Sequence, residues 1–89
     1  YPNPFNPETW IPYQLASSTE VEISIYNILG QPVRRLEIGH RHAGKYIQRS
    51  QAAYWDGRND TGELVTSGIY FYTIEAGDFT ATRKMVIGK

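Results

Sequence analysis

The stretch from Trp55 to Glu63, with the sequence WDGRNDTGE, holds the densest group of side chains with ligand chemistry. Asp56, Asn59, Asp60 and Glu63 offer oxygen atoms of the kind that calcium prefers. EF-hand loops place such ligands at alternating positions, whereas these four stand at relative positions 0, 3, 4 and 7 with an arginine among them. Asx turns account for the same residues without an ion, because Asp and Asn side chains accept hydrogen bonds from amides two residues further on.

We therefore predict a structural turn in this stretch, with glycine at the positions where the backbone must take left-handed angles. The residues assigned to the turn are Asp56, Gly57, Asn59, Asp60 and Gly62. No metal is expected, and Asp56, Asn59 and Asp60 are the candidate ligands should one bind.

Other catalytic patterns are missing from the sequence. His40 and His42 form an H-x-H pair in the segment Gly39–Gly44, but a zinc site needs further ligands, so we predict a solvated loop there. None of the five serines lies in a G-x-S-x-G or S-x-x-K frame, and the chain has no cysteine. The acidic residues sit at turns or on solvated strand faces rather than as a pair across a cleft. We predict a domain that is not an enzyme and holds no cofactor.

The composition limits both size and partners. With 89 residues, 40% of them hydrophobic, the chain forms one domain with a modest core. Nine Lys and Arg balance nine Asp and Glu, so the net charge of zero provides no field to attract nucleic acid or anionic lipid. No apolar run approaches the roughly 20 residues of a membrane span, so direct insertion is not expected. Because the first residue is not Met, we interpret the chain as a segment of a longer protein.

Short runs of aromatic and β-branched residues, separated by Gly, Asn and Asp, predict an all-β fold with essentially no helix. Tertiary packing has to stabilise it without a disulfide. The expected architecture is an antiparallel β-sandwich of six or seven short strands. The predicted strands are Trp10–Leu15, Val21–Asn27, Pro32–Ile38, one or two within Lys45–Trp55, at most a short one at Leu64-Val65, Ile69–Ala76 and Phe79–Ile87.

Local signals refine this prediction. Pro12 cannot donate a ladder hydrogen bond, so its strand should lie at an edge. The stretch from Asn27 to Gly30 predicts a tight turn, and the three-residue spacing of Val33 and Leu36 predicts a bulge if both face the core. Gly77-Asp78 between two β-rich runs predicts a two-residue hairpin with a type II′ turn.

The segment Gly68–Ile74 concentrates aromatic residues on both of its faces. Alternation places Tyr70 and Tyr72 on one face and Phe71 on the other. Core packing is the expected use of these rings, and an exposed platform for a partner or a sugar, with Trp10 or Tyr72, is the alternative. The proline-rich residues 1–9 are expected to form a stiff lead-in packed on the domain of residues 10–89, with a Pro4/Pro7 PxxP ligand as the alternative.

Five blocks together resemble the C-terminal sorting domains (type A) of the type IX secretion system. The related Ig-like domain of flagellar hook-capping proteins shares several of them. The blocks are Tyr1–Thr9, Ile25–Arg34, Trp55–Asn59, Ser67–Tyr72 and Arg83–Ile87. They occur in this order and cover the chain from end to end.

The resemblance implies an immunoglobulin-like sandwich at the C-terminus of a larger bacterial protein, secreted or held at the cell surface and exported through the periplasm. Its implied partners are the export machinery of the outer membrane and the N-terminal passenger of the same chain. By position, Lys84, Met85, Val86 and Lys89 would belong to the recognised end. A last strand with a free edge could be recognised by addition of a strand from a receptor.

One departure from the family pattern lies between Gly44 and Trp55. The resemblance implies a segment that is about four or five residues shorter than the ten residues Lys45–Tyr54 found here. An additional strand or an elaborated loop is expected there. A structural spacer and a carbohydrate-binding accessory domain of an extracellular hydrolase remain the alternative functions.

Overall fold

A computed structural model describes residues 7–88, and this part of the chain contains eight strands and no helix. It therefore holds no helix that could cross a membrane. The all-β prediction is confirmed. The strands are β1 (Thr9–Ile11), β2 (Tyr13–Leu15), β3 (Thr19–Asn27), β4 (Pro32–Arg41), β5 (Gly44–Tyr46), β6 (Ala53–Trp55), β7 (Gly68–Ala76) and β8 (Phe79–Ile87).

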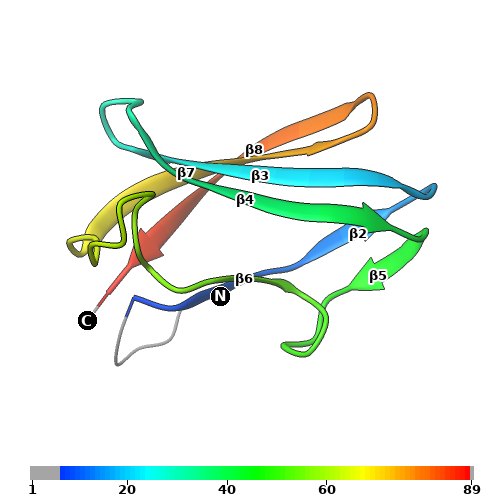
Figure 1. Ribbon diagram of the computed structural model, residues 1–89, viewed down its shortest axis with the longest axis horizontal. Coiled ribbons are helices and arrows are strands. Elements are labelled where there is room, and N and C mark those ends of the chain that lie inside the picture. Colours follow the sequence, from blue (N-terminus) through cyan, green and yellow to red (C-terminus); the bar gives the residue numbers. More distant parts are fainter. Residues whose placement is uncertain (1–6, 89) are drawn as a thin grey trace.

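The strands form two layers, as expected of an Ig-like sandwich (Figure 1). One layer is a four-stranded antiparallel sheet in the order β4-β3-β7-β8. The opposite layer consists of two antiparallel pairs, β1 with β6 and β2 with β5. Consequently β4 and β8 are the outer strands of the larger sheet, and β3 and β7 lie inside it.

A single hydrophobic core fills the space between the layers. Trp55 and Ile23 are fully buried, and the ring of Trp55 meets that of Tyr70 edge-on at 6.0 Å. Alternate residues of the strands point inward because side chains of a strand alternate between its faces. The buried apolar residues are Ile11, Tyr13, Leu15, Val21, Ile23, Ile25, Leu36, Ala53, Trp55, Val65, Tyr70, Ile74, Ala76 and Ile87.

The first predicted strand, Trp10–Leu15, is wrong as a single element. It is two strands that pair with different partners, β1 with β6 and β2 with β5, and Pro12 separates them. The cause is the missing N–H of proline, which interrupts a ladder. Each half has one paired neighbour only, so the expected edge position is confirmed.

The hairpin of β3 and β4 agrees with the prediction from the sequence at its turn and differs from that prediction at its far end. Gly30 donates to the carbonyl of Asn27 at 2.9 Å and has a φ of +80°. The register shows a bulge, as expected, and it falls at Val33 itself; a second one falls at Ile38. The second bulge lets β4 continue to Arg41, so the predicted loop Gly39–Gly44 is wrong over its first three residues.

The segment from Lys45 to Trp55 contains parts of two strands, β5 and β6, joined by a turn in which Gln51 and Ala52 both donate to the carbonyl of Gln48. Leu64-Val65 forms no strand; Leu64 makes an isolated bridge with Arg58. The buried Val65 instead closes the loop by donating its N–H to the carbonyl of Gly57 at 2.9 Å.

The β7–β8 hairpin is confirmed, with its turn at Gly77-Asp78. Gly77 has a φ of +63° and Asp78 does not have a positive φ, which is the combination of a type II′ turn. β7 lies between β3 and β8, and its two faces differ in burial. Tyr70 and Ile74 are buried in the core, and Phe71 is half-buried on the outer face.

Candidate functional site

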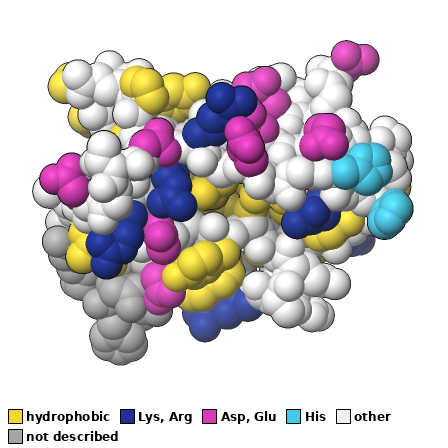
Figure 2. Space-filling model, in the orientation of Figure 1, with side chains coloured by type: hydrophobic (Ala, Val, Ile, Leu, Met, Phe, Trp, Pro, Cys, Tyr) yellow, Lys and Arg dark blue, Asp and Glu magenta, His cyan; other side chains and the backbone are white. Residues whose placement is uncertain are grey.

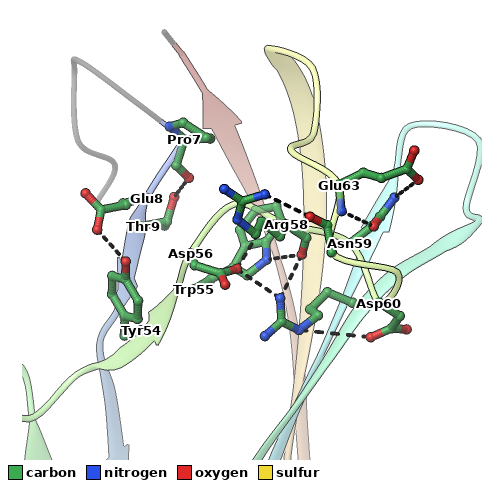
Figure 3. Close-up of polar contacts among 12 residues, drawn as sticks. Pro7, Glu8, Thr9, Tyr54, Trp55, Asp56, Arg58, Asn59, Asp60 and Glu63 are labelled. Carbon is green, nitrogen blue, oxygen red and sulfur yellow. Dashed lines mark hydrogen bonds and ion pairs between the residues drawn. The ribbon is translucent and has the colours of Figure 1, made fainter.

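Asp56 lies at the centre of a set of hydrogen bonds next to the buried Trp55 (Figure 3). Its Oδ1 accepts from the backbone N–H of Arg58 at 3.0 Å and from the guanidinium of Arg34 at 2.9 Å. The same guanidinium nitrogen donates to the carbonyl of Arg58 at 2.9 Å, and so does the indole N–H of Trp55, also at 2.9 Å. Arg34 therefore ties the loop to β4, a role that sequence spacing did not reveal.

Asn59 organises the following turn with its side-chain oxygen. Its Oδ1 accepts from the N–H groups of Thr61 at 3.1 Å and Glu63 at 2.9 Å, the pattern of an Asx turn. The Asn59 amide and the Thr61 hydroxyl donate to the Glu63 carboxylate. These two hydrogen bonds favour the charged form and so lower the pKa of Glu63.

Asp60 completes the contact with β4. Its carboxylate accepts from the N–H of Arg35 at 3.2 Å, and its own N–H donates to the carbonyl of Val33 at 2.9 Å. The Oδ1 atom of each of the three candidate metal ligands, Asp56, Asn59 and Asp60, thus accepts a hydrogen bond from the protein. Among residues 7–88, no three His, Cys, Asp or Glu side chains converge as a metal site would require.

The two histidines stand at the surface at the end of β4, with ring centroids 5.8 Å apart (Figure 2). His40 belongs to the strand and His42 follows it. The described part of the chain brings no third ligand to them. The arrangement is that of two exposed side chains on an extended segment.

The aromatic rings on the small layer are engaged within the protein. The guanidinium of Arg49 lies 4.1 Å from the ring centroid of Trp10, and the Trp10 ring also contacts that of Tyr54 at 5.6 Å. Tyr54 donates its hydroxyl to the carboxylate of Glu8, which raises the pKa of Tyr54 to about 12. Tyr72 is half-buried against the core, and this burial raises the pKa of its phenol.

The ten-residue segment Lys45–Tyr54 supplies much of this packing. Tyr46 stacks on Tyr13 at a centroid distance of 4.7 Å with nearly parallel rings. Arg49 and Tyr54 cover Trp10 as described above. The segment thus packs Tyr46 against the core and places Arg49 and Tyr54 on the ring of Trp10.

Three of the four residues expected at the recognised end, Lys84, Met85 and Val86, lie on β8, an outer strand of the larger sheet. Lys84 and Val86 are exposed on its outer face, and Met85 between them packs against the core. Alternation along the strand causes this division. Lys89 lies outside the described residues.

The hairpin register also fixes which backbone groups of β8 have no partner strand among residues 7–88. In a two-residue hairpin the residues that flank the turn, here Ala76 and Phe79, form a hydrogen-bonded pair, and such pairs alternate along the ladder. Odd-numbered residues of β8 therefore bond to β7. The N–H and C=O groups that point away from the sheet are those of Thr80, Thr82, Lys84 and Val86.

Comparisons with known proteins agree with this architecture. The family model described as "Secretion system C-terminal sorting domain" matches residues 1–88. FlgD from Pseudomonas aeruginosa is similar in structure, with a TM-score of 0.70 and 20% identity over 90% of this chain and 60% of that one. Dimeric latent PorU from Porphyromonas gingivalis gives a TM-score of 0.61 and 19% identity over 100% of this chain and 9% of that one. No curated protein matches.

The two structural likenesses support the fold alone, since both identities are low, and the chain spans only part of either protein. The family assignment rests on the family model, which covers nearly the whole sequence. With its antiparallel sandwich and its outermost C-terminal strand, this chain belongs to the family of secretion-system C-terminal sorting domains.

Proposed function

We propose that this sorting domain is recognised by the type IX export machinery through the free edge of β8, at Lys84, Met85, Val86 and Lys89. The domain itself is a non-catalytic signal module, and the protein that carries it is secreted or located at the cell surface. In this proposal the passenger precedes the domain and reaches the outer membrane through the periplasm. The activity of the passenger is independent of the signal in this scheme, because the signal lies in the domain, so an enzyme is a suitable passenger.

One observation carries the proposal: β8 ends the sheet and has four residues whose backbone groups point away from it. An exposed strand of nine residues invites pairing with another chain, and many proteins block such edges with prolines or very short strands. β8 contains no proline among Phe79–Ile87. A receptor can therefore bind it by adding a strand, with its side-chain contacts supplying specificity.

A proline scan of β8 tests this proposal. Thr82→Pro removes an N–H that points to solvent, which a strand edge tolerates. Glu37→Pro is the matched control on β4, the opposite edge of the sheet, where alternation from Leu36 also directs the N–H outward. The neighbouring Arg35 donates its N–H to Asp60, which agrees with this alternation. Arg83→Pro removes a ladder N–H and serves as the misfolding control.

The measurement is export of a reporter fused in front of residues 1–89, in a host with a type IX system, alongside thermal unfolding of each variant. We expect the wild-type domain and Glu37→Pro to export the reporter. Thr82→Pro also removes the Thr82 hydroxyl, which lies 3.0 Å from that of Thr73. We therefore expect Thr82→Pro to fold with a small decrease in melting temperature and to reduce export at least ten-fold. Wild-type levels of export by a folded Thr82→Pro domain would contradict recognition through this edge.

A further inference from the structure

The free edge of β8 borders a groove on the open side of the sandwich, where none of the strands within residues 7–88 joins β8 to the β1–β2 segment. Three hollows of about 280, 210 and 220 Å³ follow one another along this side. The first two share Leu15 and Phe79, and the last two share Pro12 and Tyr72, so they form one continuous groove. Sequence patterns gave no sign of this groove.

The floor of the groove is apolar and includes residues of the core. Leu15, Ile74 and Ala76 line it although they are otherwise buried. Phe79 also lines it, with 58% of its surface exposed. An apolar segment laid here would cover Phe79 and close the core on this side, which removes apolar surface from water.

The charges at the groove have one sign. Arg83 and Lys84 line it from β8, and no Asp or Glu lines any of its three hollows among residues 7–88. Such a site favours a partner that brings acidic residues, because opposite charges across strands attract and like charges repel. A second copy of this chain joined through β8 would instead bring two pairs of cations together.

The size of the groove fits one strand. On β8 it extends from Phe79 to Met85, seven residues or about 23 Å at the rise of an antiparallel strand. Inward side chains of an added strand would enter the hollows. Its backbone would bond to Thr80, Thr82 and Lys84.

We propose that this groove receives one extended segment of the export machinery, about seven residues long, with alternating apolar side chains and an acidic residue beside Lys84. The inference rests on the proposed function and specifies its partner. The segment pairs with the free edge of β8, and its apolar side chains cover Leu15, Tyr72 and Phe79. Binding of the segment would then both recognise the domain and close the open side of the sandwich.

Binding is tested with residues 1–89 and the synthetic peptide acetyl-SVTVEVT-amide, followed by amide hydrogen exchange. We expect the peptide to slow exchange at Thr80, Thr82 and Lys84 and to leave Glu37 on β4 unchanged. The control peptide acetyl-SVTVKVT-amide, with the acidic residue replaced by lysine, should bind about ten-fold more weakly. The Lys84→Glu variant should reverse this preference.

Absence of protection at millimolar peptide, or equal binding of the two peptides, would overturn the inference. A second experiment joins the same seven residues to the C-terminus through a flexible linker, which gives an effective concentration in the millimolar range. The tethered segment should occupy the groove and reduce reporter export at least ten-fold, whereas a tether with a central proline should not.

These experiments separate the inference from the proposed function. If the wild-type domain fails to export the reporter, the proposed function is wrong, whatever the peptide does. If the tethered segment protects the β8 amides and export continues at the wild-type level, neither the groove nor the β8 edge is the docking site, and both proposals are wrong. If neither peptide protects the β8 amides but Thr82→Pro still loses export, the inference about the groove is wrong and recognition through the β8 edge stands.

Discussion

At the scale of single residues, Gly57 and Gly62 share a left-handed backbone, with φ of +76° and +88°, but differ in their surroundings. A Cβ on Gly57 would lie 2.5 Å from a side-chain carbon of Pro7, while one on Gly62 meets nothing within 4 Å. We expect Gly62→Ala to lower the free energy of unfolding by about 1–2 kcal/mol through backbone strain. Gly57→Ala should cost about 1–3 kcal/mol more because of the clash.

Urea unfolding of the two variants measures this difference directly. Because both substitutions carry the same backbone penalty, the difference reports the packing of Pro7 on the loop. Equal destabilisation by the two alanines would mean that Pro7 does not cover Gly57 in solution.

Tyr54 should make the stability of the domain depend on pH in the alkaline range. Its hydrogen bond to Glu8 favours the neutral phenol, so its pKa rises from an ordinary 10.0 to about 12 in the folded protein. Because folding raises this pKa, the hydrogen bond contributes its full stabilisation of the folded domain at pH values below the pKa of the unfolded chain. That stabilisation is lost as the pH rises from about 10 to 12. We expect the melting temperature to fall across this window.

The Tyr54→Phe variant should lack this part of the decline, which thermal melts of both proteins at several alkaline pH values will show. Tyr13 and Tyr72, whose pKa values are also raised by burial, remain in both proteins and cancel in the comparison. A steeper alkaline decline in Tyr54→Phe than in the wild type would contradict the assignment.

At the scale of elements, the β3–β4 turn depends on the side chain of Asn27. Its Oδ1 accepts from the N–H groups of Leu29 and Gln31, each at 3.0 Å. We expect Asn27→Ala to lower the free energy of unfolding by about 1–2 kcal/mol, since both acceptor bonds are lost. Asn27→Asp keeps an oxygen at this place and should cost less than about 0.5 kcal/mol.

Chemical denaturation distinguishes the two variants. The exposed Ile28 and Leu29 at the tip of the turn contribute little to the core, so the effect should come from the turn itself. An alanine variant as stable as the aspartate variant would show that Asn27 does not hold the turn.

Elements with strong local signals could be predicted from the sequence, and those that depend on distant partners could not. The alternation of Val21, Ile23 and Ile25 and the Gly77-Asp78 turn each act over a few residues, so β3 and the β7–β8 hairpin were predictable. The division of β1 from β2 needed knowledge that their partners lie 29 or more residues away. The extension of β4 depended on a bulge that only pairing with β3 defines.

The candidate site likewise has features that local sequence signals predicted and features that only the three-dimensional contacts reveal. Position alone placed Lys84 and Val86 near the recognised end, but only the register shows that Met85 turns into the core. The loop residues were recognisable as turn formers, whereas the contact of Arg34 with Asp56 joins positions 22 residues apart. The groove beside β8 is formed by strands from both ends of the chain, so no local pattern could reveal it.

At the scale of the whole molecule, the two layers depend on the same core, and β8 contributes to it from one edge. Ile87 is 1% exposed, and Ala81 and Met85 pack against the core cluster. A domain of this length buries only about 60–65% of its unfolded surface and has a small margin of stability. The last strand should therefore be necessary for folding as well as for recognition.

Deletion of Phe79–Lys89 should leave a chain that neither unfolds cooperatively on heating nor exports the reporter, because β7 would lose its neighbour and the core would open. Circular dichroism melts and the export assay measure the two losses. Ile87→Val, which trims one buried methylene at a cost of about 0.5–1.5 kcal/mol, should retain both properties and is the matched control. A truncated chain that still melts cooperatively and still delivers the reporter would show that neither the fold nor the signal depends on β8.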